Sequence, residues 1–203
     1  MLVSRETPGA VEYFGADLGA IDRYVQLLAT WGIERGLIGP REAPRLWDRH
    51  ILNCAVVTPR LPLNATVADV GSGAGLPGLV WAIARPDLAV TLIEPLLRRT
   101  IFLDEVIEDL GLTNARVVRA RAAEVSETFD VVTARAVADL GKLAGWCLPL
   151  VRPGGLFLAL KGESAPAEVA MWTEALRRDG ATDIVVTSYG DLEKPTTVVE
   201  VSR

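Results

Sequence analysis

The stretch Val67–Leu79 constrains the fold more than any other part of the chain. It starts with the apolar run Val67–Val70, which predicts a buried strand, and it leads into Leu76–Ala84, which predicts a helix with Pro77 in its first turn. The connection between them is rich in glycine, so its backbone N–H groups can approach a ligand closely, and the N-terminus of the helix attracts negative charge. We therefore expect a nucleotide or cofactor loop.

Two kinds of ligand are compatible with this loop. Gly73, Gly75 and Gly78 match G-x-G-x-x-G, which is typical of dinucleotide loops and makes an NAD-dependent oxidoreductase one candidate. Asp69, however, stands near the carboxyl end of the strand, where a dinucleotide loop usually keeps an apolar residue because the pyrophosphate lies there. A ligand that carries an ammonium or sulfonium group favours a carboxylate. The loop therefore favours S-adenosylmethionine, with Asp69, Gly71 and Gly73 as cofactor-binding candidates, and four glycines within eight residues exceed what an ordinary turn needs.

Strand and helix patterns alternate after the connection Arg60–Asn64, which predicts a parallel sheet covered by helices. The expected strands are Val67–Val70, Val90–Glu94, Ala115–Arg119, Phe129–Ala134, Leu156–Lys161, Asp183–Ser188 and Thr196–Val201. The expected helices between them are Leu76–Ala84, Pro95–Leu110, Asp139–Leu150 and Ala165–Arg178, with a tight turn at Pro153–Gly155 before the fifth strand.

The last two expected strands follow one another without a helix, so they have to run antiparallel. A pure dinucleotide fold would keep a helical crossover at this point. The prediction is therefore an α/β fold of the class I S-adenosylmethionine-dependent methyltransferase type. Its Rossmann-like, doubly wound sheet has seven strands with an antiparallel last strand, and a short helical region precedes it.

The N-terminal region, residues 1–63, is predicted to be helical and to pack on the cofactor-binding domain, residues 64–203. Apolar residues at three- and four-residue steps predict helices over Ala16–Arg35 and from Ala43 to about Thr58. The polar side of the second helix is basic, with Arg45, Arg49 and His50, and it is a candidate RNA-facing surface. A solvated helix face, tempered by Asp48, is the alternative.

Composition limits the other function classes. At 203 residues and 50% hydrophobic content, the chain can bury a full core, and its net charge of −5 argues against a protein that coats nucleic acid with its whole surface. One histidine and two isolated cysteines predict neither a metal site nor a disulfide framework. No apolar run reaches the roughly 18 residues that span a bilayer. We expect a cytoplasmic protein without membrane contact, acting as a monomer.

The carboxyl ends of the strands carry the remaining site candidates, because ligands of open α/β sheets bind there. Glu94 closes the second strand, where a carboxylate can accept from both ribose hydroxyls. Ala122 and Ala123 follow the third strand, and their small side chains let the backbone close on an adenine ring. Glu124 could accept from the adenine amine, although a loop carboxylate with no ligand is an equal alternative.

The end of the fourth strand bears on the type of reaction. Methyltransferases that modify an exocyclic base amine commonly have an Asn/Asp-Pro-Pro-aromatic run there, whereas this chain has Thr133-Ala134-Arg135-Ala136. A cation replaces the acceptor group. Arg135 could pair with Asp69 or Glu94, but its place at a ligand-facing strand end favours a role in positioning a ligand.

Four segments together resemble the bacterial ribosomal RNA small-subunit methyltransferase G family over nearly the whole chain. The resemblance rests on Trp47–Asn53 (WDRHILN), Asp69–Gly78 (DVGSGAGLPG), Ala134 with Arg135 and Ala136, and Leu160–Gly162 (LKG). It implies transfer of the S-adenosylmethionine methyl group to N7 of one guanine in 16S ribosomal RNA of the small subunit or an assembly intermediate. By the same resemblance, Gly71 and Leu76 line the methionine part of the cofactor, Ala122 and Ala123 the adenine, and Arg135 the far side of the pocket.

The sequence departs from the family pattern at two places. The family often has a serine where Ala134 stands, and acidic residues across the stretch that includes Ala123, so the adenine contact could rest on Glu124 or on the backbone. The predicted chemistry needs no general base, because guanine N7 carries a lone pair and no proton. Seven residues are candidates for the RNA surface: Arg45, Arg49, His50, Arg98, Arg99, Lys142 and Lys161. A non-catalytic RNA-binding or assembly factor that keeps cofactor affinity remains the other alternative.

Overall fold

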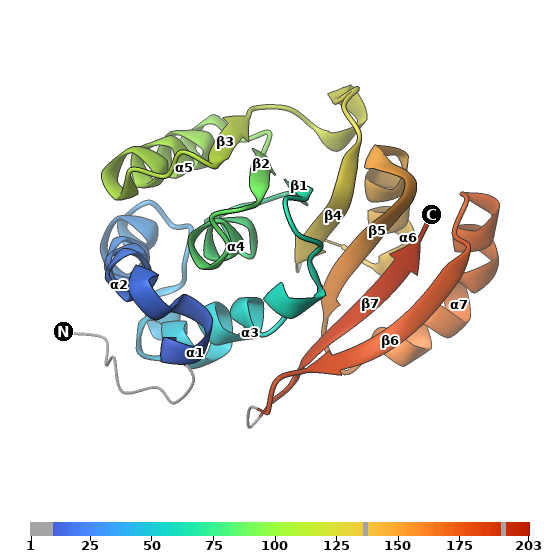
Figure 1. The fold of residues 1–203 in the computed structure, drawn as a ribbon, viewed down its shortest axis with the longest axis horizontal. Helices are drawn as coiled ribbons and strands as arrows, with labels where there is room; N and C mark the ends of the chain where they lie inside the picture. Colours follow the sequence, from blue (N-terminus) through green and yellow to red (C-terminus); the bar gives the residue numbers. More distant parts are fainter. Residues whose placement is uncertain (1–9, 136–137, 192–193) are drawn as a thin grey trace.

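The computed structural model describes residues 10–135, 138–191 and 194–203, so Ala136 of the predicted fourth-strand motif lies outside the described residues. Its centre is a seven-stranded sheet with the order β3-β2-β1-β4-β5-β7-β6 (Figure 1). The strands are β1 Thr66–Val70, β2 Ala89–Ile93, β3 Ala115–Val118, β4 Phe129–Arg135, β5 Val151–Lys161, β6 Asp183–Tyr189 and β7 Thr196–Ser202.

The direction of the strands confirms the predicted topology. Strands β1 to β5 pair in parallel, and β7 runs antiparallel to both β5 and β6. The chain order reverses between β1 and β4, where the neighbouring connections leave toward opposite faces of the sheet. In a doubly wound sheet the ligand crevice lies at this switch point, beyond the carboxyl ends of the strands.

The predicted turn at Pro153–Gly155 is wrong in one respect, because it lies inside β5 rather than before it. Phe129 of β4 is opposite Val151, and Val131 is opposite Leu156, so β5 holds extra residues at this point. Gly154 has a φ of 78°, and a bulge of this kind needs glycine. The strand therefore begins before the turn and resumes after it.

Helices cover both faces of the sheet. Figure 1 shows α4 (Gly78–Ala84) and α5 (Leu97–Leu110) on one face, and α6 (Leu140–Cys147) and α7 (Ala165–Arg178) on the other. Each face has its own hydrophobic core. The Asp139 side chain accepts from the N–H of Lys142 at 3.0 Å, which confirms the predicted cap of α6.

Helix α4 begins later than the sequence predicts. The chain is still in the glycine turn at Gly75, whose φ of 97° is outside the helical range, and Pro77 precedes the first helical residue, Gly78. A Cβ atom at position 78 would lie 2.7 Å from Asp69 Oδ2 and 2.4 Å from Leu92 Cδ2. Glycine is therefore required for the helix to approach β1 and β2 this closely.

The N-terminal region is helical but less regular than predicted. Instead of one helix over Ala16–Arg35, the chain forms α1 (Ala10–Phe14), a 3₁₀ turn, α2 (Leu18–Leu27) and a π-helical turn to Gly32. Instead of one helix from Ala43 to Thr58, it forms a 3₁₀ helix, a π-helical turn and α3 (Leu52–Ala55). Pro44 lies inside the 3₁₀ helix Pro40–Arg45 and has no backbone N–H to donate, which disfavours a regular α-helix through this segment.

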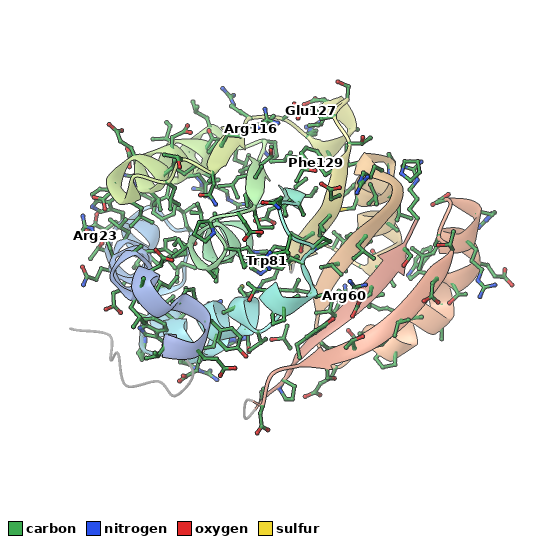
Figure 2. All side chains as sticks on the ribbon, in the orientation of Figure 1. Arg23, Arg60, Trp81, Arg116, Glu127 and Phe129 are labelled. Atoms are coloured by element: carbon green, nitrogen blue, oxygen red, sulfur yellow. The ribbon has the colours of Figure 1, made fainter. Side chains whose placement is uncertain are left out.

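This region packs on the face of the sheet that carries α4 and α5, in the same hydrophobic core. Three of its polar contacts involve residues labelled in Figure 2. The indole N–H of Trp81 on α4 donates to the carbonyl of Cys54 at 2.9 Å, Arg23 binds Asp109 of α5 at 2.7 Å, and Arg60 binds Glu200 of β7 at 2.6 Å. The N-terminal region is thus fixed to α4, α5 and β7. Within the described part of the chain, no helix is both long enough and apolar enough to span a membrane.

Candidate functional site

A cavity of about 590 Å³ opens at the carboxyl ends of β1, β2 and β4. Its walls come from the glycine loop, from the residues after β2, from the end of β4 and from the N-terminal region. The lining residues are Leu37, Ile38, His50, Gly71, Ser72, Gly73, Ala74, Leu76, Glu94, Pro95, Leu96, Arg99 and Arg135. The predicted loop residues Gly71, Gly73 and Leu76 and both predicted strand-end residues, Glu94 and Arg135, therefore meet in one place.

The glycine loop is held by its own backbone. Gly71, Gly73 and Gly75 have φ values of 72°, 59° and 97°, which glycine adopts without steric cost. The N–H of Gly71 donates to the carbonyl of Ile93 at 2.8 Å, and the N–H of Gly75 donates to Ser72 at 2.7 Å. The loop is thus anchored to the end of β2, close to Glu94.

Asp69 is fully buried beneath this loop. Its Oδ2 accepts from the N–H of Gly78 at 3.0 Å, whereas Oδ1 is buried without a hydrogen-bond partner. Burial raises the pKa of this carboxyl to about 7, against the lowering effect of the Gly78 N–H. A buried oxygen without a partner is costly unless a ligand or water donates to it, so Asp69 is suited to a cationic ligand group.

Glu94, which is 1% exposed, follows β2 directly. Its Oε2 accepts from the N–H of Gly73 at 3.0 Å and from Arg99 at 3.2 Å, and its Oε1 accepts from the N–H of Leu96 at 3.0 Å. Arg99, one of the candidates for the RNA surface, lies at the wall of the cavity beside Glu94, and its Nε is buried without a partner. Glu94 therefore both anchors the glycine loop and presents its carboxylate at the cavity.

A second, mostly apolar cavity of about 460 Å³ adjoins the first at Gly71 and Pro95. Ala122 and Ala123, the candidates for the adenine contact, line it, and so does Trp146 of α6. Trp146 is 41% exposed, and the sequence did not predict its place at this cavity because a tryptophan in a helix pattern carries no sign of a ligand. Glu124 lies nearby, but its Oε2 accepts from the N–H of Arg121 at 2.8 Å and so caps the short 3₁₀ turn.

Arg135 forms its hydrogen bonds with the N-terminal region, not with Asp69 or Glu94 as the ion-pair alternative supposed. Its guanidinium reaches His50 Nδ1 at 2.7 Å and Cys54 Sγ at 3.1 Å. His50 Nε2 in turn lies 2.9 Å from Glu42 Oε2. Glu42 is a further residue that the sequence did not predict, because a spacing of eight residues from His50 does not by itself indicate a contact.

The other candidates for an RNA surface differ in the solvent exposure of their side chains and in their ion pairs. Arg45 and Arg98 are exposed, and two further residues are exposed but paired: Arg49 with Glu42 at 3.2 Å, and Lys142 with Asp139 at 3.6 Å. Lys161 is different, because its side chain is only 10% exposed and its ammonium already binds Glu168 and the carbonyl of Ala138 at 2.8 and 2.9 Å. Among the residues that the structure describes, no group of three or more His, Cys, Asp and Glu residues could hold a metal ion.

Comparison with solved structures identifies the fold. The chain superimposes with a TM-score of 0.63 on the S-adenosylmethionine-dependent methyltransferase SibL, at 19% identity, over 98% of this chain and 71% of that one. A ribosomal protein L11 methylase from Lactobacillus delbrueckii gives a TM-score of 0.59 at 17% identity, over 74% and 76% of the two chains. The predicted class I methyltransferase fold is thereby confirmed.

Sequence comparison identifies the family and decides against the NAD-dependent oxidoreductase. The family model described as rRNA small subunit methyltransferase G matches residues 17–196. The ribosomal RNA small subunit methyltransferase G of Salinispora arenicola is 58% identical over 94% of this chain and 83% of its own length. The protein of the same name from Renibacterium salmoninarum is 56% identical over 93% and 90% of the two chains. The chain therefore belongs to the rRNA small subunit methyltransferase G family, and it is an S-adenosylmethionine-dependent methyltransferase.

Proposed function

We propose that the protein transfers the methyl group of S-adenosylmethionine to N7 of a guanine in 16S ribosomal RNA. The observation that carries this proposal is the composition of the first cavity, which has the Glu94 carboxylate at one side and the Arg135 guanidinium at another, with the buried Asp69 carboxyl beneath the glycine loop that lines it. A cationic cofactor and a neutral, electron-rich base edge suit these two sides. Relatives named for methylation of ribosomal RNA in the small subunit support the substrate class.

The residues fit the cofactor. The partnerless Oδ1 of Asp69 beneath the loop, and the absence of side chains at Gly71 and Gly73 where they line the cavity with Leu76, suit the methionine part of S-adenosylmethionine. Glu94 at the end of β2 would accept from the ribose hydroxyls. The apolar slot beside Ala122 and Ala123 suits the adenine ring, with the Glu124 carboxylate at its edge. When bound, the cofactor supplies a methyl group activated by a positively charged sulfur.

The cavity also fits a base that loses no proton. Guanine N7 has an in-plane lone pair and carries no proton, so methylation at this atom would require no side chain to remove a proton. Arg135 can donate to O6 or to a phosphate and so hold the base edge in line. The protein's contribution would be orientation and exclusion of water.

Analysis of the product tests this function. Small subunits from cells that lack the gene are incubated with the protein and labelled S-adenosylmethionine, and the RNA is digested with nuclease for mass spectrometry. We expect 7-methylguanosine. A methyl group on an exocyclic amine, a ribose oxygen or a pyrimidine carbon would contradict the proposal, because each of these acceptors has to shed a proton. Binding to the subunit without methyl transfer would favour the non-catalytic assembly factor.

The physical state of the substrate is part of the proposal. We expect recognition of RNA within the small subunit or an assembly intermediate by a cytoplasmic monomer, through the exposed arginines of the N-terminal region and of the first turn of α5, Arg45, Arg49 and Arg98. These local cations are compatible with a net charge of −5, since binding depends on the charge near the phosphates. Parallel reactions with naked 16S RNA and with subunits separate the two substrates.

A further inference from the structure

The guanidinium of Arg135 is fixed by a short segment of the N-terminal region. Nη2 lies 2.7 Å from His50 Nδ1 and 3.3 Å from the carbonyl oxygen of Arg49, and Nη1 lies 3.1 Å from Cys54 Sγ and 3.4 Å from the carbonyl oxygen of His50. None of these four acceptors is a carboxylate. The shortest of the four contacts, to the imidazole, therefore determines the direction of the guanidinium more than any charge pair does.

The contacts of His50 determine the protonation state of its ring. A guanidinium only donates, so Nδ1 of His50 has to carry the lone pair, and the proton of the neutral ring lies on Nε2. That proton points to Glu42 Oε2, 2.9 Å away, and the other oxygen of Glu42 binds Arg49 at 3.2 Å. The side chains form a chain from Arg49 through Glu42 and His50 to Arg135. Each link fixes the orientation of the next.

We propose that His50 is a positioning residue that acts through Arg135: its neutral ring, oriented by Glu42, accepts from the guanidinium and holds it at the wall of the cavity. The inference deepens the proposed function, on which it rests, because both residues line the cavity that would receive the guanine. It gives His50 a role within the protein in place of a phosphate contact. The His50 side chain, at 14% exposed, is poorly placed for a phosphate but well placed to support Arg135.

Protonation of His50 would remove this support. A charged imidazole has no acceptor, and it would place two cations in contact. Burial and the positive charge of Arg135 lower the pKa of His50, against the opposing effect of Glu42, while Arg49 lowers it further. The ring therefore stays neutral at neutral pH and charges only below the ordinary histidine value of 6.5. The rate of methyl transfer should carry an acidic limb that belongs to this residue.

Amide substitutions test whether a hydrogen-bond acceptor at the position of Nδ1 is sufficient for the role of His50. The side-chain oxygen of Asn can take the place of Nδ1, whereas the amide of Gln reaches the place of Nε2. Relative to wild type, we expect His50→Asn to keep most of the single-turnover rate on saturating small subunits. We expect His50→Gln and His50→Leu to lose on the order of 10²-fold, as a displaced catalytic group does. Affinity for S-adenosylhomocysteine and thermal stability, measured in parallel, show that each variant is folded. Equal rates for wild type and His50→Leu, or equal losses for the Asn and Gln variants, would overturn the inference.

The pH profile and a nuclear magnetic resonance experiment complete the test. In His50→Asn the part of the acidic limb that belongs to His50 should be missing, while the part caused by protonation of Asp69 remains in both proteins. The chain has a single histidine, so ¹⁵N-histidine labelling of the protein without a histidine tag gives one set of ring signals. We expect the Nε2–H form and a rise of the His50 pKa in Arg135→Met. A proton on Nδ1, or a His50 pKa that does not change in Arg135→Met, would overturn the inference. These signals do not depend on methyl transfer, so they test the inference even if the proposed methylation fails.

Discussion

The phenolic hydroxyl of Tyr24 donates a 2.7 Å hydrogen bond to the carbonyl of Ala74, fifty positions away in the chain. Tyr24 lies on α2 and is fully buried, and Ala74 lies in the middle of the glycine loop. A Cβ atom at Gly75 would lie 2.9 Å from the same hydroxyl, so the tyrosine also contributes to the requirement for glycine there. The N-terminal region thus packs against the glycine loop and helps to fix its conformation.

Tyr24→Phe should loosen this loop. The change leaves the Ala74 carbonyl buried without a donor, which costs about 1–3 kcal/mol of folding free energy, and part of that loss should weaken the binding of S-adenosylhomocysteine. Chemical denaturation and calorimetric titration measure the two effects.

Tyr189→Phe is a matched control for this prediction. It removes a hydroxyl that donates to Glu200 at 2.6 Å, on strands separated from β1 by β4 and β5. The control variant should lose stability without losing affinity for the cofactor product. Unchanged affinity in Tyr24→Phe as well would show that the hydroxyl does not shape the loop.

Glu94→Ala should weaken the binding of S-adenosylmethionine, since the variant lacks both the ribose acceptor and the anchor of the Gly73 N–H. Loss of a hydrogen bond to a charged group costs about 1.5–3 kcal/mol, which calorimetric titration resolves easily. Glu168→Ala is the comparison, because that carboxylate also accepts from a backbone N–H, of Leu140 at 2.8 Å, and binds a cation, but it does not line the cavity. Equal affinity of both variants for the cofactor would remove Glu94 from the site.

Much of the fold could be predicted from the sequence because its signals are local. The apolar runs and the glycine loop predict β1 and the loop itself, and the missing helix between the last two strands predicts their antiparallel pairing. The predictions were wrong where tertiary contacts determine the bounds of an element. Helix α4 starts at Gly78 because the loop before it remains bound to β2, and β5 contains a bulge that is defined only by its pairing with β4. No local pattern carries such information.

The candidate site was predictable to the extent that it is built from strand ends. Glu94 and Arg135 follow strands whose carboxyl ends meet at one edge of the sheet, so their proximity could be expected. Trp146 and Tyr24 lie on helices, where a ligand-facing aromatic residue has the same spacing as one in a core. The place of Trp146 at the apolar cavity and the contact of Tyr24 with the glycine loop depend on how α6 and α2 pack, and only the structure shows this.

Affinity for S-adenosylhomocysteine should rise with pH through about 7, the value to which burial raises the pKa of Asp69. The ionised carboxylate attracts the ammonium group of the ligand, whereas the protonated form does not. Asp69→Asn should bind weakly and lose this pH dependence. Calorimetric titrations between pH 5.5 and pH 8.5, in roughly half-unit steps around the expected midpoint, measure it.

The same pKa shift predicts the sign of a stability effect. Between 3.8 and about 7 the folded protein holds a proton on Asp69 that the unfolded chain has released, so the free energy of unfolding falls as pH rises across this window. Asp69→Asn removes that contribution. Its stability relative to wild type should therefore increase from acidic to neutral pH in chemical denaturation. A constant difference between the two proteins would show that Asp69 ionises normally in the folded state.

Reversal of Arg45 and Arg49 to Glu should impair binding to the small subunit while cofactor binding stays intact. Both side chains are exposed on the N-terminal region, beside the segment that holds Arg135. Each lost phosphate contact should reduce the slope of log affinity against log salt by about 0.7–0.9. Arg49 also binds Glu42, so Arg45→Glu alone tests the surface without disturbing His50.

Reversal of Arg177 and Arg178, exposed in the last turn of α7, changes the net charge by the same amount and should leave binding almost unaffected. If the Arg45 and Arg49 variant binds subunits as wild type does at every salt concentration, these arginines form only a solvated face.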